Sequence, residues 1–281
     1  MEILYNESLK TYTTVRIGGI AERLYIPESS EELISLLETL PDYYILSGGS
    51  NVLINDQKSF KNVILLKKFD LTIENIGNGE YYVGASVRLQ NLINTIHKDG
   101  YGGIEYLYSV PGLVGGAITM NAGRGRPYGL NISDYVTHVH VYENGTTKII
   151  PKHECQFIYR SSIFKNNNII ILGARFTFDN IESKKLLEAK QERIQMTKNA
   201  QDYSGFNFGS VFMDNDWRIM WLVRRLHPGY KGGICYSKKT ANWMLNNGDG
   251  TFKQARKLIN NVEKLHRLIG KKAVPEVIIW D

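Results

Sequence analysis

The order of hydrophobic and polar residues predicts helices and strands in alternation over the first part of the chain. Residues 29–40 (SSEELISLLETL) place four leucines on one helical face, after a Ser29–Glu32 pair typical of a capping box. The apolar runs at 43–46 and 62–66 flank a glycine turn and are typical of buried strands. This alternation favours an α/β subdomain over the first 66 residues.

Strands predominate from residue 67 to about residue 180, around one helix predicted at 87–97. The expected strands cover residues 81–85, 135–142, 147–151 and 169–178. Asn144-Gly145 separates two of them and is a strong signal for a two-residue hairpin. The middle of the chain therefore predicts a sheet with little helix.

Helices predominate again towards the C-terminus. A long polar helix is predicted at 182–199 and a second at 251–269, with Thr251 as its N-cap. Two shorter elements fall around 216–225 and 238–246, and VPEVIIW near the end is strand-like. These patterns predict an α+β chain of three modules, covering residues 1–66, 67–181 and 182–281.

Composition narrows the class of protein. With 281 residues, 43% hydrophobic and 22% charged, the chain is expected to be globular rather than disordered. No run of apolar residues is long enough to span a bilayer, and MEILYNESLK lacks the layout of a signal peptide. Cys155 and Cys235 are too few for a disulfide framework or a four-cysteine zinc site. We therefore expect a cytoplasmic protein with no membrane contact.

The net charge of +6 suits an anionic ligand such as a nucleotide or phosphate. The basic residues are scattered in short pairs, so we expect no nucleic-acid partner. The sequence carries no signal for the oligomeric state. His138 and His140 share one face of a predicted strand, but without a third ligand we expect no metal.

Glycines gather in four clusters, at 18–19, 48–49, 112–116 and 123. Glycine turns let successive backbone N–H groups point to one side, which forms an anion-binding concavity. Each cluster alone is more often a tight turn, but several together could hold the pyrophosphate of a dinucleotide. The patterns G-x-G-x-x-G and G-x-x-x-x-G-K-[ST] are absent, so a doubly wound nucleotide site is not expected.

Seven blocks in order carry a resemblance to a known family. They are TTVRIGG (13–19), LSGGSNVLI (46–54), SVPGLVGGAITMNAG (109–123), YRSSIFK (159–165), GSVF (209–212), SKKTANWMLN (237–246) and PEV (275–277). In this order, along essentially the whole chain, they resemble the UDP-N-acetylenolpyruvoylglucosamine reductase family, also called UDP-N-acetylmuramate dehydrogenases.

The resemblance implies an FAD-binding fold of the vanillyl-alcohol-oxidase type, with two flavin-binding subdomains (1–66 and 67–181) and a smaller α+β substrate-binding domain (182–281). It implies non-covalent FAD, with NADPH as hydride donor. The implied reaction reduces the enolpyruvyl ether of a UDP-sugar, UDP-N-acetylglucosamine-enolpyruvate, to UDP-N-acetylmuramate. This step serves peptidoglycan synthesis, and through it cell wall biogenesis, cell shape and cell division. The residues implied to bind the cofactor are Thr14, Gly18, Gly48, Gly49, Ser50, Asn51, Pro111, Gly112, Gly115, Gly116 and Gly123.

Three further residues match the family's catalytic positions. Ser210 would donate a proton, Arg160 would stabilise the charge on the developing enolate, and Glu276 would complete the site. Taken alone, such residues are usually a turn serine, a surface cation and a solvated carboxylate. The residues implied to bind substrate are Tyr159, Asp214, Lys231 and Asn242.

The blocks implied to bind substrate depart from the family. Met213-Asp214-Asn215 stands where the family usually has Lys-Asn-Pro, and Thr240 replaces a histidine. Two interpretations remain open: a divergent housekeeping reductase, or a paralogue acting on another nucleotide-linked sugar. A non-catalytic nucleotide-binding module is a third, against which the joint presence of Ser210, Arg160 and Glu276 argues.

Overall fold

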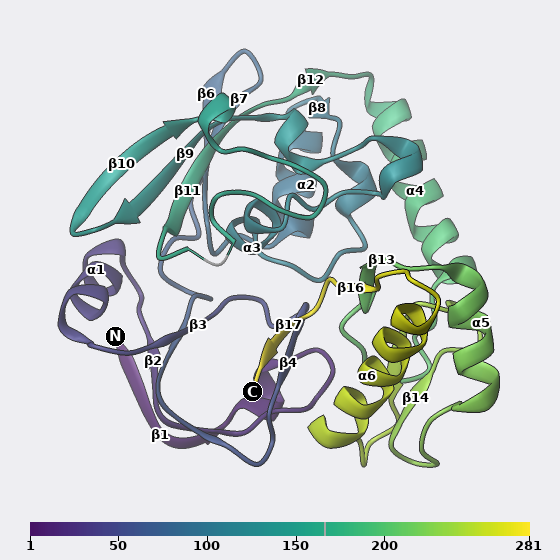
Figure 1. Ribbon diagram of the computed structural model, residues 1–281. Coiled ribbons are helices and arrows are strands. Elements are labelled where there is room, and N and C mark those ends of the chain that lie inside the picture. The colour runs from purple at the N-terminus through teal and green to yellow at the C-terminus, as the bar shows by residue number, and fades with distance from the viewer. Residues whose placement is uncertain (166) are drawn as a thin grey trace. The chain divides into compact units, whose positions relative to one another are not determined.

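The structure is a computed structural model that describes residues 1–165 and 167–281. The chain divides into two compact units, and Figure 1 labels many of their helices and strands. Unit 1 comprises residues 1–3, 25–48 and 64–197, and unit 2 comprises residues 4–24, 49–63 and 198–281. Each unit is therefore assembled from segments far apart in the sequence.

A five-stranded antiparallel sheet forms the centre of unit 1, in the order β10-β9-β11-β7-β6. Its strands are β6 (Ile73–Gly77), β7 (Glu80–Gly84), β9 (Val136–Glu143), β10 (Thr146–Pro151) and β11 (Ile170–Thr177). Asn144 and Gly145, with φ of 49° and 81°, turn β9 into β10, which pair from Glu143 and Thr146 onward. Positive φ at both positions is what a type I′ hairpin requires, so the predicted hairpin is confirmed.

Among the residues of unit 1 that the structure describes there are four α-helices: α1 (Ser30–Thr39), α2 (Leu89–Lys98), α3 (Val114–Thr119) and α4 (Ser183–Ala200), of which α4 ends in unit 2. Buried residues of α1, α2 and α3 join those of the five-stranded sheet in one core. The Ser29 side chain accepts a hydrogen bond from the Glu32 N–H, which confirms that half of the predicted capping box. The Glu32 carboxylate instead accepts from the Glu28 N–H and the chain's N-terminus.

A second sheet has the order β1-β2-β5-β3, with β1 at Glu2–Ser8, β2 at Ile20–Ile26, β3 at Tyr44–Leu46 and β5 at Ser59–Leu65. The strands predicted at 43–46 and 62–66 correspond to β3 and β5. The sequence pattern did not predict β1 or β2. β1 is an edge strand with mostly exposed residues, so it shows no alternation of buried and exposed positions.

Unit 2 contains two helices and three small strand pairs. The helices are α5 (Trp217–Leu226) and α6 (Phe252–Leu268), the latter capped by Thr251 as predicted. The pairs are β4 (Val52–Ile54) with β17 (Ile278–Trp280), β13 (Phe212–Asp214) with β16 (Val274–Pro275), and β14 (Ile234–Tyr236) with β15 (Met244–Asn246). The element expected over 238–246 is only the short strand β15. Its preceding residues form a loop that contributes to the candidate site.

The remaining short strands, β8 (Tyr101–Gly102) and β12 (Asp179–Asn180), pair with each other in unit 1. Within the part of the chain that the structure describes, no helix combines the length and apolar character needed to cross a bilayer.

Candidate active site

Ser210 lies in a turn that unit 2 holds from two sides. Gly209, with φ of 78°, adopts a left-handed conformation that suits glycine, and its N–H donates to the Asn207 side chain at 3.1 Å. On one side, the Val211 N–H donates to the Asn242 carbonyl at 2.9 Å. On the other, the Val211 carbonyl accepts the Glu276 N–H at 2.8 Å. Two of the three predicted catalytic residues, Ser210 and Glu276, are therefore on neighbouring segments of unit 2.

The Asn242 side chain forms two hydrogen bonds with the peptide groups of Phe212. Its Oδ1 accepts the Phe212 N–H at 3.0 Å, and its Nδ2 donates to the Phe212 carbonyl at 2.6 Å. Phe212 pairs with Pro275 on β16, and proline has no N–H to offer that carbonyl. Asn242 therefore supplies both partners and fixes the strand that follows Ser210. The predicted substrate contact of Asn242 remains a prediction.

The predicted cofactor loop is tied to the predicted catalytic glutamate. Asn51 Nδ2 donates to the backbone carbonyl of Glu276 at 3.1 Å, and the Asn51 carbonyl accepts the Ile278 N–H at 3.0 Å. The Thr14 N–H donates to the Gly49 carbonyl at 2.9 Å, with the Thr14 hydroxyl at 3.4 Å. The sequence match alone gave no sign that Asn51 also positions Glu276.

Gly49 has a backbone reason to be glycine. Its φ is 65°, and a Cβ there would lie 2.0 Å from the Tyr12 carbonyl oxygen. Among the described residues, none accepts a hydrogen bond from the N–H groups of Gly48, Gly49 or Ser50. A turn with free amide donors and no side chain on its glycines fits a pyrophosphate.

A second predicted cofactor loop, Pro111 to Gly116, lies against Ser47 and Gly48 within unit 1. A Cβ at Gly48 would be 3.5 Å from the Leu113 nitrogen, and one at Gly116 would be 3.3 Å from Ser47 Oγ. The loop from Pro111 to Gly116 is anchored from behind, since the Gly112 carbonyl accepts the Leu89 N–H and the Gly115 N–H donates to the Ala85 carbonyl. In unit 1, Gly48 and Gly116 thus each pack closely against the neighbouring segment, where a larger side chain would crowd the backbone or Ser47.

Arg160 is held in unit 1 by backbone carbonyls at and before the glycine at position 123. Its guanidinium donates to the Gly123 carbonyl at 2.8 Å and to the Asn121 carbonyl at 3.4 Å. Arg160 also has φ of 57°, in a tight turn closed by hydrogen bonds between Ile158 and Ser161. A left-handed arginine costs about 1–2 kcal/mol and persists only where its surroundings impose it, as at many functional sites.

The other predicted substrate residues are spread over both units. Tyr159, in unit 1, lies near two cations, with the guanidinium carbons of Arg126 at 4.6 Å and Arg160 at 5.1 Å from its ring centre. Asp214 ends β13 and is exposed, and Lys231 is exposed on the loop after α5.

A buried network not found by sequence reasoning supports the loop before Asn242. The Asp202 carboxylate accepts hydrogen bonds from the hydroxyls of Ser204 at 2.6 Å and Ser237 at 2.7 Å. Ser237 Oγ in turn accepts the N–H groups of Lys239 and Thr240. Burial opposes ionisation of Asp202, but the bonds from Ser204 and Ser237 outweigh it and hold its pKa below the usual value. A lone aspartate in QDYS carries no motif that could have identified it.

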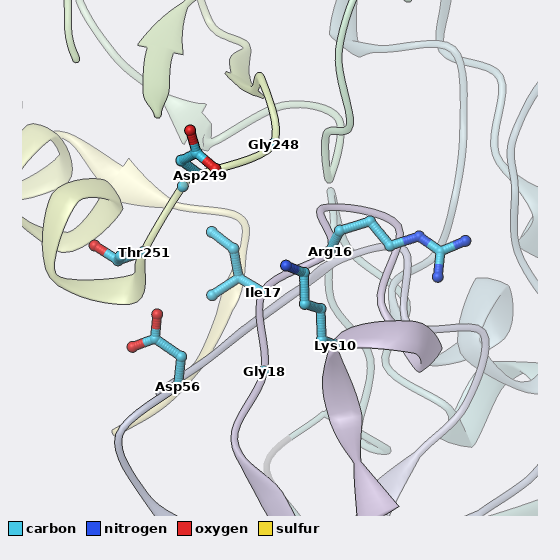
Figure 2. A pocket seen from close by; sticks show the side chains of 9 residues that line it. Lys10, Arg16, Ile17, Gly18, Asp56, Gly248, Asp249 and Thr251 are labelled. Atoms are coloured by element: carbon cyan, nitrogen blue, oxygen red, sulfur yellow. The ribbon is translucent and has the colours of Figure 1, made fainter. Parts of the chain in front are cut away.

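Gly18 has a packing role in the structure. A Cβ there would lie 2.7 Å from the Leu9 carbonyl carbon and the Lys10 nitrogen. Gly18 lines a hollow of about 320 Å³ in unit 2, whose charged rim includes Lys10, Asp56 and Asp249 (Figure 2). The Asp56 carboxylate already accepts the Phe252 N–H at the start of α6. The contact of Gly18 with the flavin remains a prediction.

The structure gives no support to the cysteines or to the His138–His140 pair as reactive or metal-binding residues. Cys155 is buried, which raises the pKa of its thiol to about 11 and leaves little thiolate at neutral pH. His140 stacks edge-on against Tyr82, and burial lowers its pKa. Within residues 1–165 and 167–281, no group of three or more His, Cys, Asp or Glu side chains could hold a metal ion.

Comparison with known proteins adds the following similarities. The FAD binding domain model matches residues 21–150. UDP-N-acetylenolpyruvoylglucosamine reductase of Carboxydothermus hydrogenoformans is 33% identical over 94% of this chain and 88% of its own length. The Fusobacterium nucleatum enzyme of that name is 30% identical over 99% of both chains. The crystal structure of the Thermus caldophilus enzyme covers 100% of this chain and 98% of its own, with a TM-score of 0.80 and 26% identity.

Proposed function

Because the chain belongs to the UDP-N-acetylenolpyruvoylglucosamine reductase family, we propose that it makes UDP-N-acetylmuramate for peptidoglycan synthesis. It is an FAD-dependent oxidoreductase with NADPH as hydride donor, and its substrate is the enolpyruvyl ether of UDP-N-acetylglucosamine. When bound by the glycine turns at Gly48 to Asn51 and Pro111 to Gly116, FAD would supply the redox chemistry as carrier of a hydride from NADPH to the enolpyruvyl group. The protein supplies position, charge stabilisation and a proton.

The glycine-rich turns of each unit support the assignment of the cofactor-binding residues. Gly48 to Asn51 offers free amide donors to the pyrophosphate, and Pro111 to Gly116 with Gly123 would line the flavin. We assign flavin binding to residues 1–66 and 67–181 and substrate binding to residues 182–281. The purified protein should carry FAD that is released by acid precipitation, and flavin absorbance that stays with the precipitate would contradict a non-covalent site.

Ser210, Arg160 and Glu276 are the proposed catalytic residues. Hydride addition leaves negative charge beside the substrate carboxylate, which a guanidinium stabilises and a proton from the Ser210 hydroxyl then removes. Arg160 suits this role because the carbonyls of Gly123 and Asn121 orient its guanidinium. Glu276 is set against the Ser210 turn by the hydrogen bond of its N–H to the Val211 carbonyl. That shared placement of Ser210 and Glu276 is the observation that carries the proposal.

Ser210→Ala tests the proposed role of the serine. Reduction of FAD by NADPH requires no proton at the enolpyruvyl carbon, so that half-reaction should keep its rate. Reoxidation by substrate should slow by on the order of 10²–10⁴-fold, and Ser210→Cys should be less impaired because a thiol can still donate.

Stopped-flow flavin spectra measure the two half-reactions separately. The matched control is Ser35→Ala, at an exposed serine of α1 outside the proposed site, which should alter neither rate. Equal loss in both half-reactions would mean that Ser210 shapes the flavin pocket instead.

The residues after Ser210 favour a second candidate for the substrate. In β13, Met213 and Asp214 stand where the family usually has a lysine and an asparagine. The strand therefore lacks that cation and that amide and carries the exposed carboxylate of Asp214. A carboxylate repels a substrate that carries a diphosphate and a carboxylate of its own. A paralogue acting on another, less anionic nucleotide-linked sugar would share the same flavin and reduction residues.

A further inference from the structure

The outer face of α5 exposes two tryptophans. The helix buries Ile219, Met220 and Val223 in the core of unit 2. On the opposite side Trp217 is 71% exposed and Trp221 is 55% exposed. Aromatic surface of this size is costly to leave in water, and it marks a site of interaction when it is contiguous.

Arginines accompany both rings. Trp217, Trp221 and Arg225 are spaced four residues apart, so they follow one line along the helix. The guanidinium carbons of Arg218 and Arg225 lie 5.5 Å from the ring centres of Trp217 and Trp221, respectively. Leu222 adds exposed aliphatic surface beside this line. The face is therefore apolar and cationic at once.

The charged residues of α5 and of the segment that follows it are all basic. Residues 217–248 contain three arginines and three lysines and no acidic residue. Arg224 donates to the Lys238 carbonyl at 3.3 Å, which brings part of this segment beside α5. Asp216, at the start of α5, forms an ion pair with Lys271. The charge of this face therefore favours an anionic occupant.

We propose that the outer face of α5, defined by Trp217, Arg218, Trp221, Leu222 and Arg225, docks on an anionic lipid bilayer. Tryptophan side chains favour the headgroup region, where the ring is partly buried and the indole N–H stays hydrogen-bonded. Arginines beside them pair with lipid phosphates, and a helix with this mixed face lies flat in the interface. A second copy of the same face would set cation against cation, which disfavours self-association through α5.

This surface is separate from the proposed catalytic residues and does not depend on their assignment. It differs from the sequence-based expectation of no membrane contact because the structure leaves Trp217 and Trp221 exposed to solvent. The tryptophans at 217 and 221 have the same helical spacing that core residues have.

Vesicle binding by the full-length protein tests the proposal. We expect cosedimentation with phosphatidylcholine vesicles that contain phosphatidylglycerol, and little with phosphatidylcholine alone. Binding should weaken as salt rises. Intrinsic tryptophan emission should shift to shorter wavelength on binding, because the indoles leave water.

Two double variants and a matched control locate the contact. Arg218→Gln with Arg225→Gln should weaken vesicle binding by about 30-fold, since each cation near an anionic surface contributes about 1 kcal/mol. Trp217→Gln with Trp221→Gln should weaken binding and abolish the emission shift. The control, Lys184→Gln with Lys185→Gln, removes the same charge from exposed positions of α4 and should have little effect. All three should keep wild-type turnover and melting temperature.

Three results would overturn the proposal. The first is no binding to the anionic vesicles at low salt. The second is an equal loss of binding in the α4 control, which would mean that the whole protein's charge attracts the vesicles. The third is a change in the oligomeric state of the α5 variants without vesicle binding, which would assign the face to a protein partner.

Discussion

Replacement of Asn242 by alanine should destabilise unit 2 and misplace Ser210. The Asn242 side chain makes two hydrogen bonds with the peptide groups of Phe212, at 3.0 and 2.6 Å. Phe212 is 2% exposed, so water cannot readily replace either bond. Alanine thus leaves one buried donor and one buried acceptor without a partner.

The expected magnitude follows from these two groups. An unsatisfied buried polar group costs about 1–3 kcal/mol, so the free energy of unfolding should fall by about 2–6 kcal/mol. Asn242→Asp should not rescue it, because a carboxylate oxygen would face the Phe212 carbonyl in place of the amide donor. The comparison variant is Thr240→Ala, which loses a single hydrogen bond to the Ala200 carbonyl at a partly exposed position. Its cost should be about 0.5–1.5 kcal/mol.

Urea unfolding of the FAD-loaded protein measures the stability change, and stopped-flow spectra measure the two half-reactions. Reduction by NADPH should be little affected in Asn242→Ala, whereas reoxidation by substrate should slow because the strand after Ser210 is released. An unfolding free energy within 0.5 kcal/mol of wild type, a change below the range expected for even one lost bond, would refute the reasoning. If substrate affinity alone fell, Asn242 would be a substrate contact, as the family match predicts.

Three further variants or treatments give separate checks. Asp202→Asn should destabilise the protein at neutral pH; because the folded pKa of Asp202 lies below its ordinary value of 3.8, the difference from wild type should shrink as pH falls below about 4, and urea unfolding at several pH values measures it. Iodoacetamide at pH 8 should modify Cys235 but not the native Cys155, whose pKa burial raises to about 11, and mass spectrometry would detect the contrary result. Met213→Lys with Asp214→Asn should tighten binding of the UDP-sugar by about one to two decades, and an unchanged Kd would show that other cations compensate.

The sequence by itself determined the elements whose signals are local. The N-cap at Ser29, the cap at Thr251 and the Asn144-Gly145 turn form as predicted, although the Glu32 half of the Ser29 capping box does not. Each of these signals depends on residues only a few positions apart. The sequence pattern did not predict the strands β1 and β2. β1 has no buried face of its own, and it is a strand only because β2 lies beside it.

The seven blocks in family order determined the candidate residues, but not what holds them. Hydrogen bonds join Asn51 to Glu276, 225 positions apart, and Asn242 to Phe212, 30 positions apart. No local sequence pattern predicts these hydrogen-bonded pairs, because an asparagine that makes such a bond looks in the sequence like any other asparagine in a loop. Asp202 is a still clearer case, because only its burial against Ser204 and Ser237 distinguishes it from a solvated aspartate.

Tertiary structure also decided which side of an apolar helix is covered. In α5 the pattern WRIMWLVRRL sets Trp217 and Trp221 four residues apart, a spacing that core residues also have, so the sequence does not show whether these two rings are covered. Packing in unit 2 covers Ile219, Met220 and Val223 and leaves Trp217 and Trp221 in solvent. Burial is a property of the neighbours that the fold brings together, and those neighbours are distant in the sequence.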